Sequence, residues 1–276
     1  MDRIRLIASD MDATLLDEQS QLPADFEETI HALAELGIRF APASGRPLYT
    51  LEAMFPTLRD ELVFIGDNGG AIRWKGQNLF TSEMSPEGWR ALNRLTREQG
   101  DIAVLCGLES AYVERPFAVH DAVLRHFYTK IEYVDRLEDV AAPADKFTIY
   151  LPQHNAQQAY DTVYASQRSI YSVAVAGECW VDIMNPGVHK GAALQALGQL
   201  WGLPSESMMA FGDTYNDAEM LCTAKYGFLM ENGSVPLRQK VPFLAPSHRE
   251  AGVMQVLRRV LAQNGCVCPE DFVPAH

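Results

Sequence analysis

The chain alternates short apolar runs with segments in which apolar residues recur every three or four positions. Residues 4–9, 38–43 and 62–65 form apolar runs, and residues 23–37 carry the helical period, with a proline at the start and a glycine at the end. Short apolar runs that alternate with amphipathic helices are typical of a parallel sheet covered by helices. The N-terminal part of the chain therefore predicts an α/β fold whose first three strands are these runs.

The pattern changes after residue 81. Residues 71–74 and 78–81 flank Lys75-Gly76 and predict a β-hairpin. Beyond the hairpin, helical segments mix with short runs that partly alternate between apolar and polar residues. We expect helices over 86–99, 119–128 and 155–166, and strands over 102–106, 111–113, 147–151, 172–175 and 180–184.

After a break at Asn185-Pro186-Gly187 the chain returns to the first pattern, with a further apolar run over residues 208–212. Because both ends share this pattern, we predict a Rossmann-like parallel-sheet core of residues 1–81 and 185–276. Residues 82–184 would form an α+β domain inserted into that core. The length of 276 residues suits such a division into two domains.

The composition argues against a nucleic-acid-binding, membrane-spanning or secreted protein. The net charge of −13 repels nucleic acid and anionic membranes, so neither is an expected partner. No apolar stretch reaches the roughly 20 residues that a membrane helix needs. The five cysteines are scattered without zinc spacing, and Asp2 and Arg3 precede the first strand in place of a signal peptide. We expect a cytoplasmic protein with reduced thiols, either a monomer or a weak homo-oligomer.

The candidate chemistry lies where the predicted strands end. Asp10 and Asp12 follow the first run, Ser44 follows the second, and Asp213 follows the run at 208–212. In an open parallel sheet these carboxyl ends meet along one edge, where ligands bind. Each residue alone also suits a turn or a helix cap. Together they predict an acidic site that needs a cation, since neighbouring carboxylates repel each other.

Lys190 is unusual for its place in a predicted helix. The helix carries Ala193, Leu194 and Leu197 on its apolar face and follows Pro186-Gly187, so Lys190 falls in or near the first turn. The helix dipole disfavours a cation there. A bound anion would explain the lysine, because helix N-termini bind phosphate. The alternative is a solvated surface lysine.

In this order and spacing, the residues resemble the four motifs of the haloacid dehalogenase superfamily. The motifs are Asp10-Met11-Asp12-Ala13-Thr14, Ser44-Gly45-Arg46, Lys190-Gly191, and Gly212-Asp213 with Asn216-Asp217. The insertion after the third strand is similar to the C2B cap of the Cof-type phosphatases. Asn68-Gly69-Gly70 and Met230-Glu231-Asn232-Gly233 are also similar to segments of that subfamily. The resemblance covers essentially the whole chain.

The resemblance implies a Mg²⁺-dependent phosphatase of small phosphomonoesters, such as sugar phosphates or phosphorylated cofactors like FMN and pyridoxal phosphate. Asp10 would be the nucleophile that forms an aspartyl-phosphate, and Asp12 the general acid and base. Asp10, the backbone carbonyl of Asp12 and Asp213 would hold Mg²⁺, with Asp217 acting through a water or behind the ligands. The phosphate-binding residues implied are Ser44, Gly45, Arg46, Lys190 and Asn216.

Two other functions remain open from the sequence. One is a sugar phosphomutase of the same superfamily, which would keep the phosphoenzyme. The other is a non-catalytic metabolite-binding protein on the same scaffold, and its only support is Ala13, which stands where the superfamily usually has glycine. Alanine costs little there if its φ is negative, whereas a positive φ would favour glycine. No P-loop, G-x-G-x-x-G, H-E-x-x-H or G-x-S-x-G motif offers a different chemistry.

Overall fold

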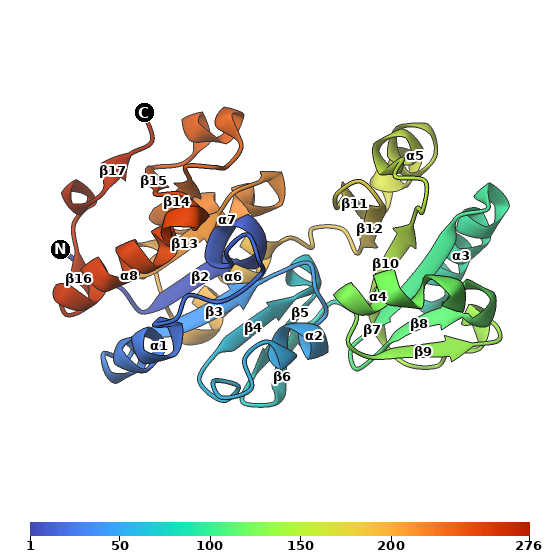
Figure 1. The fold of residues 1–276 in the computed structure, drawn as a ribbon, viewed down its shortest axis with the longest axis horizontal. Coiled ribbons are helices and arrows are strands. Elements are labelled where there is room, and N and C mark those ends of the chain that lie inside the picture. The colour runs from blue at the N-terminus through green and yellow to red at the C-terminus, as the bar shows by residue number, and fades with distance from the viewer.

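A computed structural model describes residues 1–276, and the chain forms two lobes joined by two linkers (Figure 1). One lobe is built on a nine-stranded sheet and the other on a six-stranded sheet, which we call the core sheet and the cap sheet. Strands of the cap sheet all come from between residues 102 and 184. The core sheet takes its strands from both sides of that range.

The core sheet is parallel at its centre. Its strands are β2 (Leu6–Asp10), β3 (Arg39–Ala43), β4 (Val63–Gly66), β5 (Ala71–Trp74), β6 (Gln77–Thr81), β13 (Met208–Gly212), β14 (Tyr226–Met230), β15 (Phe243–Ala245) and β17 (Val273–Pro274). They lie in the order β17-β15-β14-β13-β2-β3-β4-β5-β6. Neighbours from β15 to β4 are parallel, whereas β17, β5 and β6 pair antiparallel. A separate pair joins β1 (Asp2–Arg3) to β16 (Cys266–Val267).

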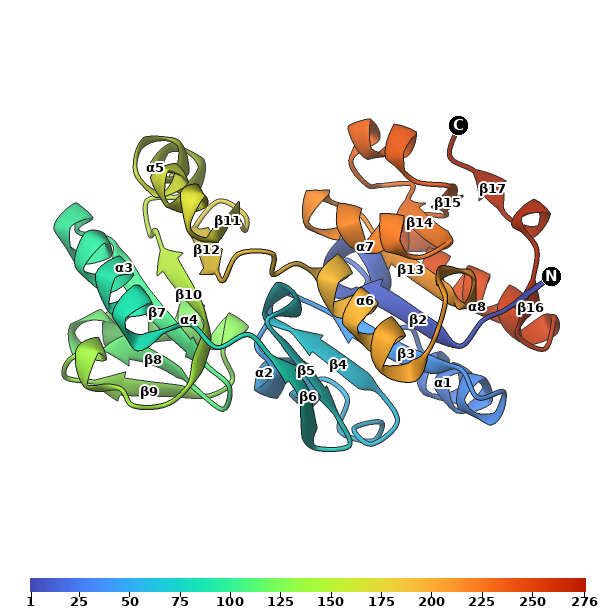
Figure 2. The same ribbon diagram turned by 180° about the vertical axis from the view of Figure 1, so that it is seen from behind.

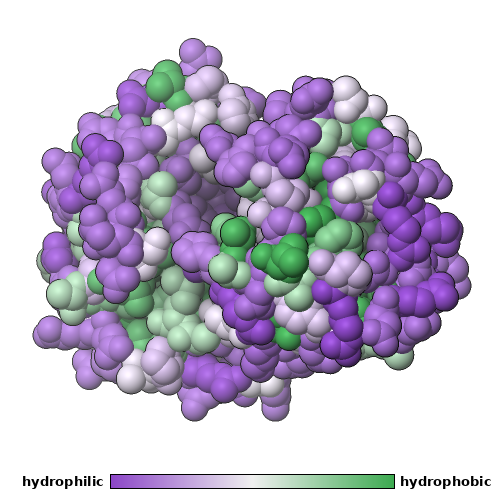
Figure 3. All heavy atoms as spheres, turned by 45° about the vertical axis from the view of Figure 1, so that its right-hand side comes forward, coloured by the Kyte–Doolittle hydropathy of each residue, from purple (hydrophilic) through white to green (hydrophobic).

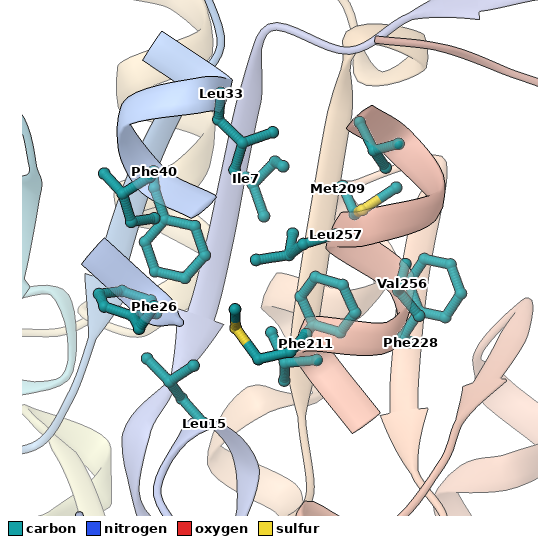
Figure 4. Packing of buried hydrophobic residues seen from close by; sticks show 14 of the residues in the cluster. Ile7, Leu15, Phe26, Leu33, Phe40, Met209, Phe211, Phe228, Val256 and Leu257 are labelled. Atoms are coloured by element: carbon teal, nitrogen blue, oxygen red, sulfur yellow. The ribbon is translucent and has the colours of Figure 1, made fainter. Parts of the chain in front are cut away.

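Helices cover both faces of the core sheet (Figures 1 and 2). The apolar cluster on one face includes α1 (Phe26–Glu35), α2 (Leu48–Ala53) and α8 (Gly252–Ala262), and the cluster on the other includes α6 (Lys190–Trp201) and α7 (Ala218–Thr223). Ile7 and Phe211 pack toward α8, where Leu257 meets them (Figure 4). The central strands are buried on both faces, which explains why they read as continuous apolar runs. Each fully buried side chain of this kind contributes about 1.5–3 kcal/mol.

The cap sheet is antiparallel apart from one pair. Its strands are β7 (Ile102–Gly107), β8 (Ala111–Glu114), β9 (Ile131–Val134), β10 (Ala144–Tyr150), β11 (Ser172–Val175) and β12 (Trp180–Met184), in the order β11-β12-β10-β7-β8-β9. Only β8 and β9 are parallel. Two helices, α3 (Pro86–Gln99) and α5 (Ala156–Thr162), pack on one face, and α4 (Asp121–Phe127) packs on the other through Leu124.

One asparagine ties the two linkers together. The Nδ2 atom of Asn185 in the second linker lies 2.9 Å from the backbone oxygen of Glu83 and 3.2 Å from that of Ser82 in the first. It also reaches the Ser82 hydroxyl at 3.1 Å. The two connections between the lobes therefore meet at one hydrogen-bonded point.

The predicted α/β class is confirmed, and so are the first three strands, the hairpin and the helix over 86–99. The helix expected over 155–166 is wrong in its length: α5 ends at Thr162, and a short 3₁₀ turn follows over Tyr164–Ser169. All five cysteines are free. None of the helices has both the length and the apolar character needed to cross a membrane.

Candidate active site

Two neighbouring strands deliver the acidic residues to one edge of the core sheet. Asp10 is the last residue of β2, and Asp213 follows the last residue of β13. The parallel register sets Phe211 beside Ser9, so both carboxylates leave the sheet at the same level. The sequence-based expectation that separate strand ends meet is therefore confirmed for these two residues.

Three buried aspartates form a compact cluster at this edge. One carboxylate oxygen from each of Asp10, Asp213 and Asp217 lies within 4.8 Å of the others. Lys190 Nζ donates to Asp10 Oδ1 at 2.5 Å and to Asp217 Oδ1 at 2.7 Å. Thr14, which had no role assigned from sequence, donates to Asp213 Oδ1 at 3.5 Å.

Lys190 is the first residue of α6 and has no exposed surface. The alternative of a solvated surface lysine is therefore wrong. His189 precedes it as the N-cap, with its side chain accepting from the backbone N–H of Ala192 at 3.1 Å. Burial alone would lower the pKa of Lys190, but Asp10 and Asp217 outweigh that effect and raise it. The ammonium stays charged at the positive end of a helix because two carboxylates hold it there.

The crowding of these buried acids raises the pKa values of two of them, Asp10 and Asp213. Burial, with a further contribution from Asp217, raises the pKa of Asp10 to about 8 even though Lys190 opposes the change. Burial and Asp217 also raise the pKa of Asp213 to about 6. A single ammonium thus leaves the cluster short of positive charge at neutral pH.

Asp217 is held by the backbone that follows β13. Its Oδ2 accepts from the N–H groups of Asp213 at 3.0 Å and Thr214 at 3.2 Å. A Cβ on Gly212 would lie 2.4 Å from the Cβ of Asp217, so only glycine permits this close return of the chain. Both oxygens of Asp217 already accept hydrogen bonds, which suits a residue that supports the site from behind.

Asp12 points away from this cluster. Its exposed carboxylate pairs with Arg46, whose Nη2 lies 2.9 Å from Asp12 Oδ1. Any part of Asp12 in holding a metal would therefore use its backbone carbonyl, as the sequence-based expectation has it. Ser44 is buried, and its Oγ accepts from the Arg46 N–H at 3.1 Å, which leaves its own hydroxyl proton available.

Ala13 has a φ of 58°, in the left-handed region that favours glycine. The condition under which alanine would cost little is therefore not met. The Ala13 carbonyl accepts a hydrogen bond from Asn232 Nδ2 at 2.8 Å, which helps to hold this conformation. The chain keeps the turn that a glycine would make easily, at a cost of about 1 kcal/mol.

The remaining predicted residues lie close by, but with different partners. Asn216 is exposed, and its Oδ1 accepts from the Thr214 hydroxyl at 2.5 Å, so the structure shows no contact from it to the cluster. A Cβ on Gly45 would lie 3.2 Å from the Asn68 amide. Figure 3 shows that the molecular surface is hollowed between the two lobes, with polar residues on part of the rim and hydrophobic residues on the rest.

Residues 7–257 match the family model described as haloacid dehalogenase-like hydrolase. The chain belongs to this family. It is similar to 5-amino-6-(5-phospho-D-ribitylamino)uracil phosphatase YbjI of Escherichia coli K12, with 32% identity over 94% of this chain and 96% of the relative. It is also 32% identical to the HMP-PP phosphatase of Cronobacter sakazakii, over 87% of this chain and 89% of the relative.

Solved structures share the fold of this chain. SMU.1108c of Streptococcus mutans superimposes with a TM-score of 0.83 at 29% identity, covering 94% of this chain and 99% of that one. A HAD/COF-like hydrolase of Plasmodium vivax has a TM-score of 0.84 at 18% identity, over 95% and 97% of the two chains, and shows the shared fold. The protein is a phosphatase of this family, that is, a phosphoric monoester hydrolase.

The donor set suits a hard divalent cation. Three carboxylates against one ammonium leave a net excess of negative charge when all are ionised. All the available donors are oxygens, which Mg²⁺ and similar cations prefer over nitrogen or sulfur. A bound cation would also remove the repulsion that raises the pKa values of Asp10 and Asp213.

Proposed function

We propose that this protein hydrolyses small phosphomonoesters in a Mg²⁺-dependent reaction, through an aspartyl-phosphate on Asp10. The observation that carries the proposal is the buried cluster of Asp10, Asp213 and Asp217 with Lys190 at its centre. Such a cluster is costly unless a cation balances its excess negative charge. A divalent metal supplies that charge, and a phosphate ester can then bind beside the metal and Lys190.

In this proposal each residue acts through the contacts described above. Asp10 attacks phosphorus, and Lys190 holds its carboxylate in place while offering positive charge to the phosphoryl oxygens. Asp12 gives a proton to the leaving alkoxide and later takes one from water, with Arg46 orienting it. Ser44 and the backbone of Gly45 contact the phosphoryl group. When bound, Mg²⁺ at Asp10, Asp213 and the Asp12 carbonyl would neutralise charge between nucleophile and phosphate.

The substrate class is an organic phosphate small enough to fit between the lobes. We propose sugar phosphates or phosphorylated cofactors, and the relatives that act on a phosphoribitylaminouracil and on HMP-PP support this range. Residues 82–184 would act as the cap that encloses the leaving group and excludes water. The family assignment supports phosphate release. No feature of the site favours the phosphomutase, and the non-catalytic alternative has only Ala13 in its support.

The test is phosphate release from a panel that includes ribose 5-phosphate, FMN, pyridoxal phosphate and the phosphoribitylaminouracil, with Mg²⁺ or with EDTA. We expect release only with the metal, and a loss of at least about 1,000-fold in Asp10→Asn because the nucleophile is gone. Asp60→Asn is the matched control, since Asp60 is an exposed acid outside the site. Metal-independent release, or full activity in Asp10→Asn, would contradict the proposal.

A further inference from the structure

Each of the three backbone carbonyls in the loop of residues 44–46 accepts a hydrogen bond from a different donor. The Ser44 carbonyl accepts from the N–H of Asn68 at 2.9 Å, and the Arg46 carbonyl accepts from the N–H of Asp67 at 3.0 Å. Both donors belong to the turn that follows β4, so the core itself satisfies the first and last carbonyls of the loop.

The middle carbonyl has a partner from the other lobe. Lys146 of β10 extends from the cap sheet and donates from Nζ to the Gly45 carbonyl at 2.5 Å. Lys146 is only 2% exposed, which is rare for a lysine and excludes a casual surface contact. The three backbone carbonyls of this loop thus all have partners only when the cap packs on the core.

A network of buried acids fixes the lysine in this position. Lys146 Nζ lies 2.9 Å from Asp67 Oδ1 and 3.6 Å from Asp182 Oδ2. Thr148, on the same face of β10, donates to Asp182 Oδ1 at 2.7 Å, and Asn68 Nδ2 donates to Asp182 Oδ2 at 3.2 Å. Burial alone would lower the pKa of Lys146, but Asp182 and Asp67 together raise it well above its ordinary value. The ammonium therefore donates as a full cation.

The turn that shares this network is strained. Asp67 and Asn68 are consecutive non-glycine residues with φ values of 50° and 54°. Each left-handed residue of this kind costs about 1–2 kcal/mol, and such strain persists only where surrounding contacts impose it. Lys146 and Asp182 make such contacts with Asp67 and Asn68. The cap therefore also supports the turn of the core whose backbone N–H groups bind the 44–46 loop.

We propose that Lys146 is a positioning residue carried by the cap: its hydrogen bond to the Gly45 carbonyl fixes the 44–46 loop, and with it the Arg46–Asp12 pair. This rests on the proposed function, because it is the general acid Asp12 that gains from the alignment. Lys146 itself touches no reacting atom in this scheme. It makes the geometry of the loop depend on cap closure, so that proton transfer is aligned only in the closed enzyme.

Lys146→Met and Thr148→Val form a matched pair for the test. The first removes the donor to Gly45, and the second removes a hydrogen bond of the same network while leaving that donor in place. Two substrates separate positioning from general damage. p-Nitrophenyl phosphate has a leaving group that needs no proton, whereas ribose 5-phosphate has an alkoxide leaving group that does.

We expect Lys146→Met to lower kcat for ribose 5-phosphate at least about 10-fold more than kcat for p-nitrophenyl phosphate, with KM within about 3-fold of wild type. Thr148→Val should leave both values near wild type. Hydrogen exchange of the peptide spanning residues 44–68 should speed up in Lys146→Met only. If Lys146→Met does not fold, Lys146→Met with Asp67→Asn removes the unpaired acid along with the cation, and the same comparison applies.

Equal losses on both substrates with unchanged exchange over residues 44–68 would overturn the positioning role, as would equal effects in the two variants. A wild-type protein that releases no phosphate from either substrate would instead contradict the proposed function. In that case the hydrogen-exchange comparison still decides whether Lys146 holds the loop.

Discussion

Ala13 carries a cost within the first motif, because its φ of 58° is one that glycine adopts more easily. We predict that Ala13→Gly raises the free energy of unfolding by about 0.5–1 kcal/mol, since relief of the strain exceeds the added entropy of the unfolded chain. Urea denaturation measures this change.

The control for that substitution is Ala34→Gly on the exposed side of α1. There the same change should lower the free energy of unfolding by about 0.5–1 kcal/mol, because glycine weakens a helix. Effects of the same sign at both positions would contradict the role of φ. An unchanged turnover in Ala13→Gly would show that the methyl group does not hinder the phosphate.

At the scale of elements, the linkers between the lobes depend on Asn185, whose amide reaches two backbone carbonyls and a hydroxyl of the first linker. We predict that Asn185→Ala increases cleavage by Glu-C protease after Glu83 several-fold, because the linker loses its hydrogen-bonded support. Gel analysis of timed digests measures the rate.

Ser82→Ala is the comparison for this experiment. It removes only the hydroxyl contact and leaves the two carbonyl contacts of Asn185. We expect a digestion rate close to wild type, and equal rates in the two variants would show that the carbonyl contacts contribute nothing.

The elements that the sequence predicted well are those whose pattern is set by burial alone. The strands β2, β3 and β13 lie in the middle of the sheet and are mostly apolar, with Ser9 and Asp10 at the end of β2 and Arg39 at the start of β3. By contrast, α2 spans six residues and β15 three, which is too short to show a period.

The residues of the site also divide into those that a local sequence pattern predicts and those that depend on tertiary packing. Asp10, Lys190 and Asp213 were predicted because each stands at the end or start of a readable element. The contact of Lys146 with Gly45 depends on how the cap packs against the core, which no local pattern records. The only sign in the sequence is a pair of charged residues, Asp145 and Lys146, directly before an apolar run.

For the whole molecule, the raised pKa of Asp10 links stability to pH. The folded protein binds a proton at Asp10 up to about pH 8, whereas the unfolded chain releases it near pH 3.8. Between these values the folded state holds more protons, so this residue makes the metal-free protein less stable as pH rises. We predict that Tm in EDTA falls between pH 5.5 and pH 8 through this contribution.

Mg²⁺ should reverse the trend, because it competes with the proton for the same carboxylates. Thermal unfolding at both pH values, with and without Mg²⁺, should show a larger stabilisation by the metal at pH 8. Asp10→Asn should lose most of the difference, since a carboxamide does not titrate between pH 5.5 and pH 8. A gain in Tm that is the same at both pH values would contradict the linkage.

The order of strands in the core sheet has a consequence for the chain during its synthesis. Residues 6–10 form β2, which lies between β13 and β3, and β13 begins only at Met208. The strand that carries Asp10 therefore lacks its neighbour β13 until most of the chain has left the ribosome. The strands of the cap sheet come from one continuous stretch and face no such delay. The lobe with the cap sheet can thus form during synthesis before β2 and β13 bring Asp10 and Asp213 together.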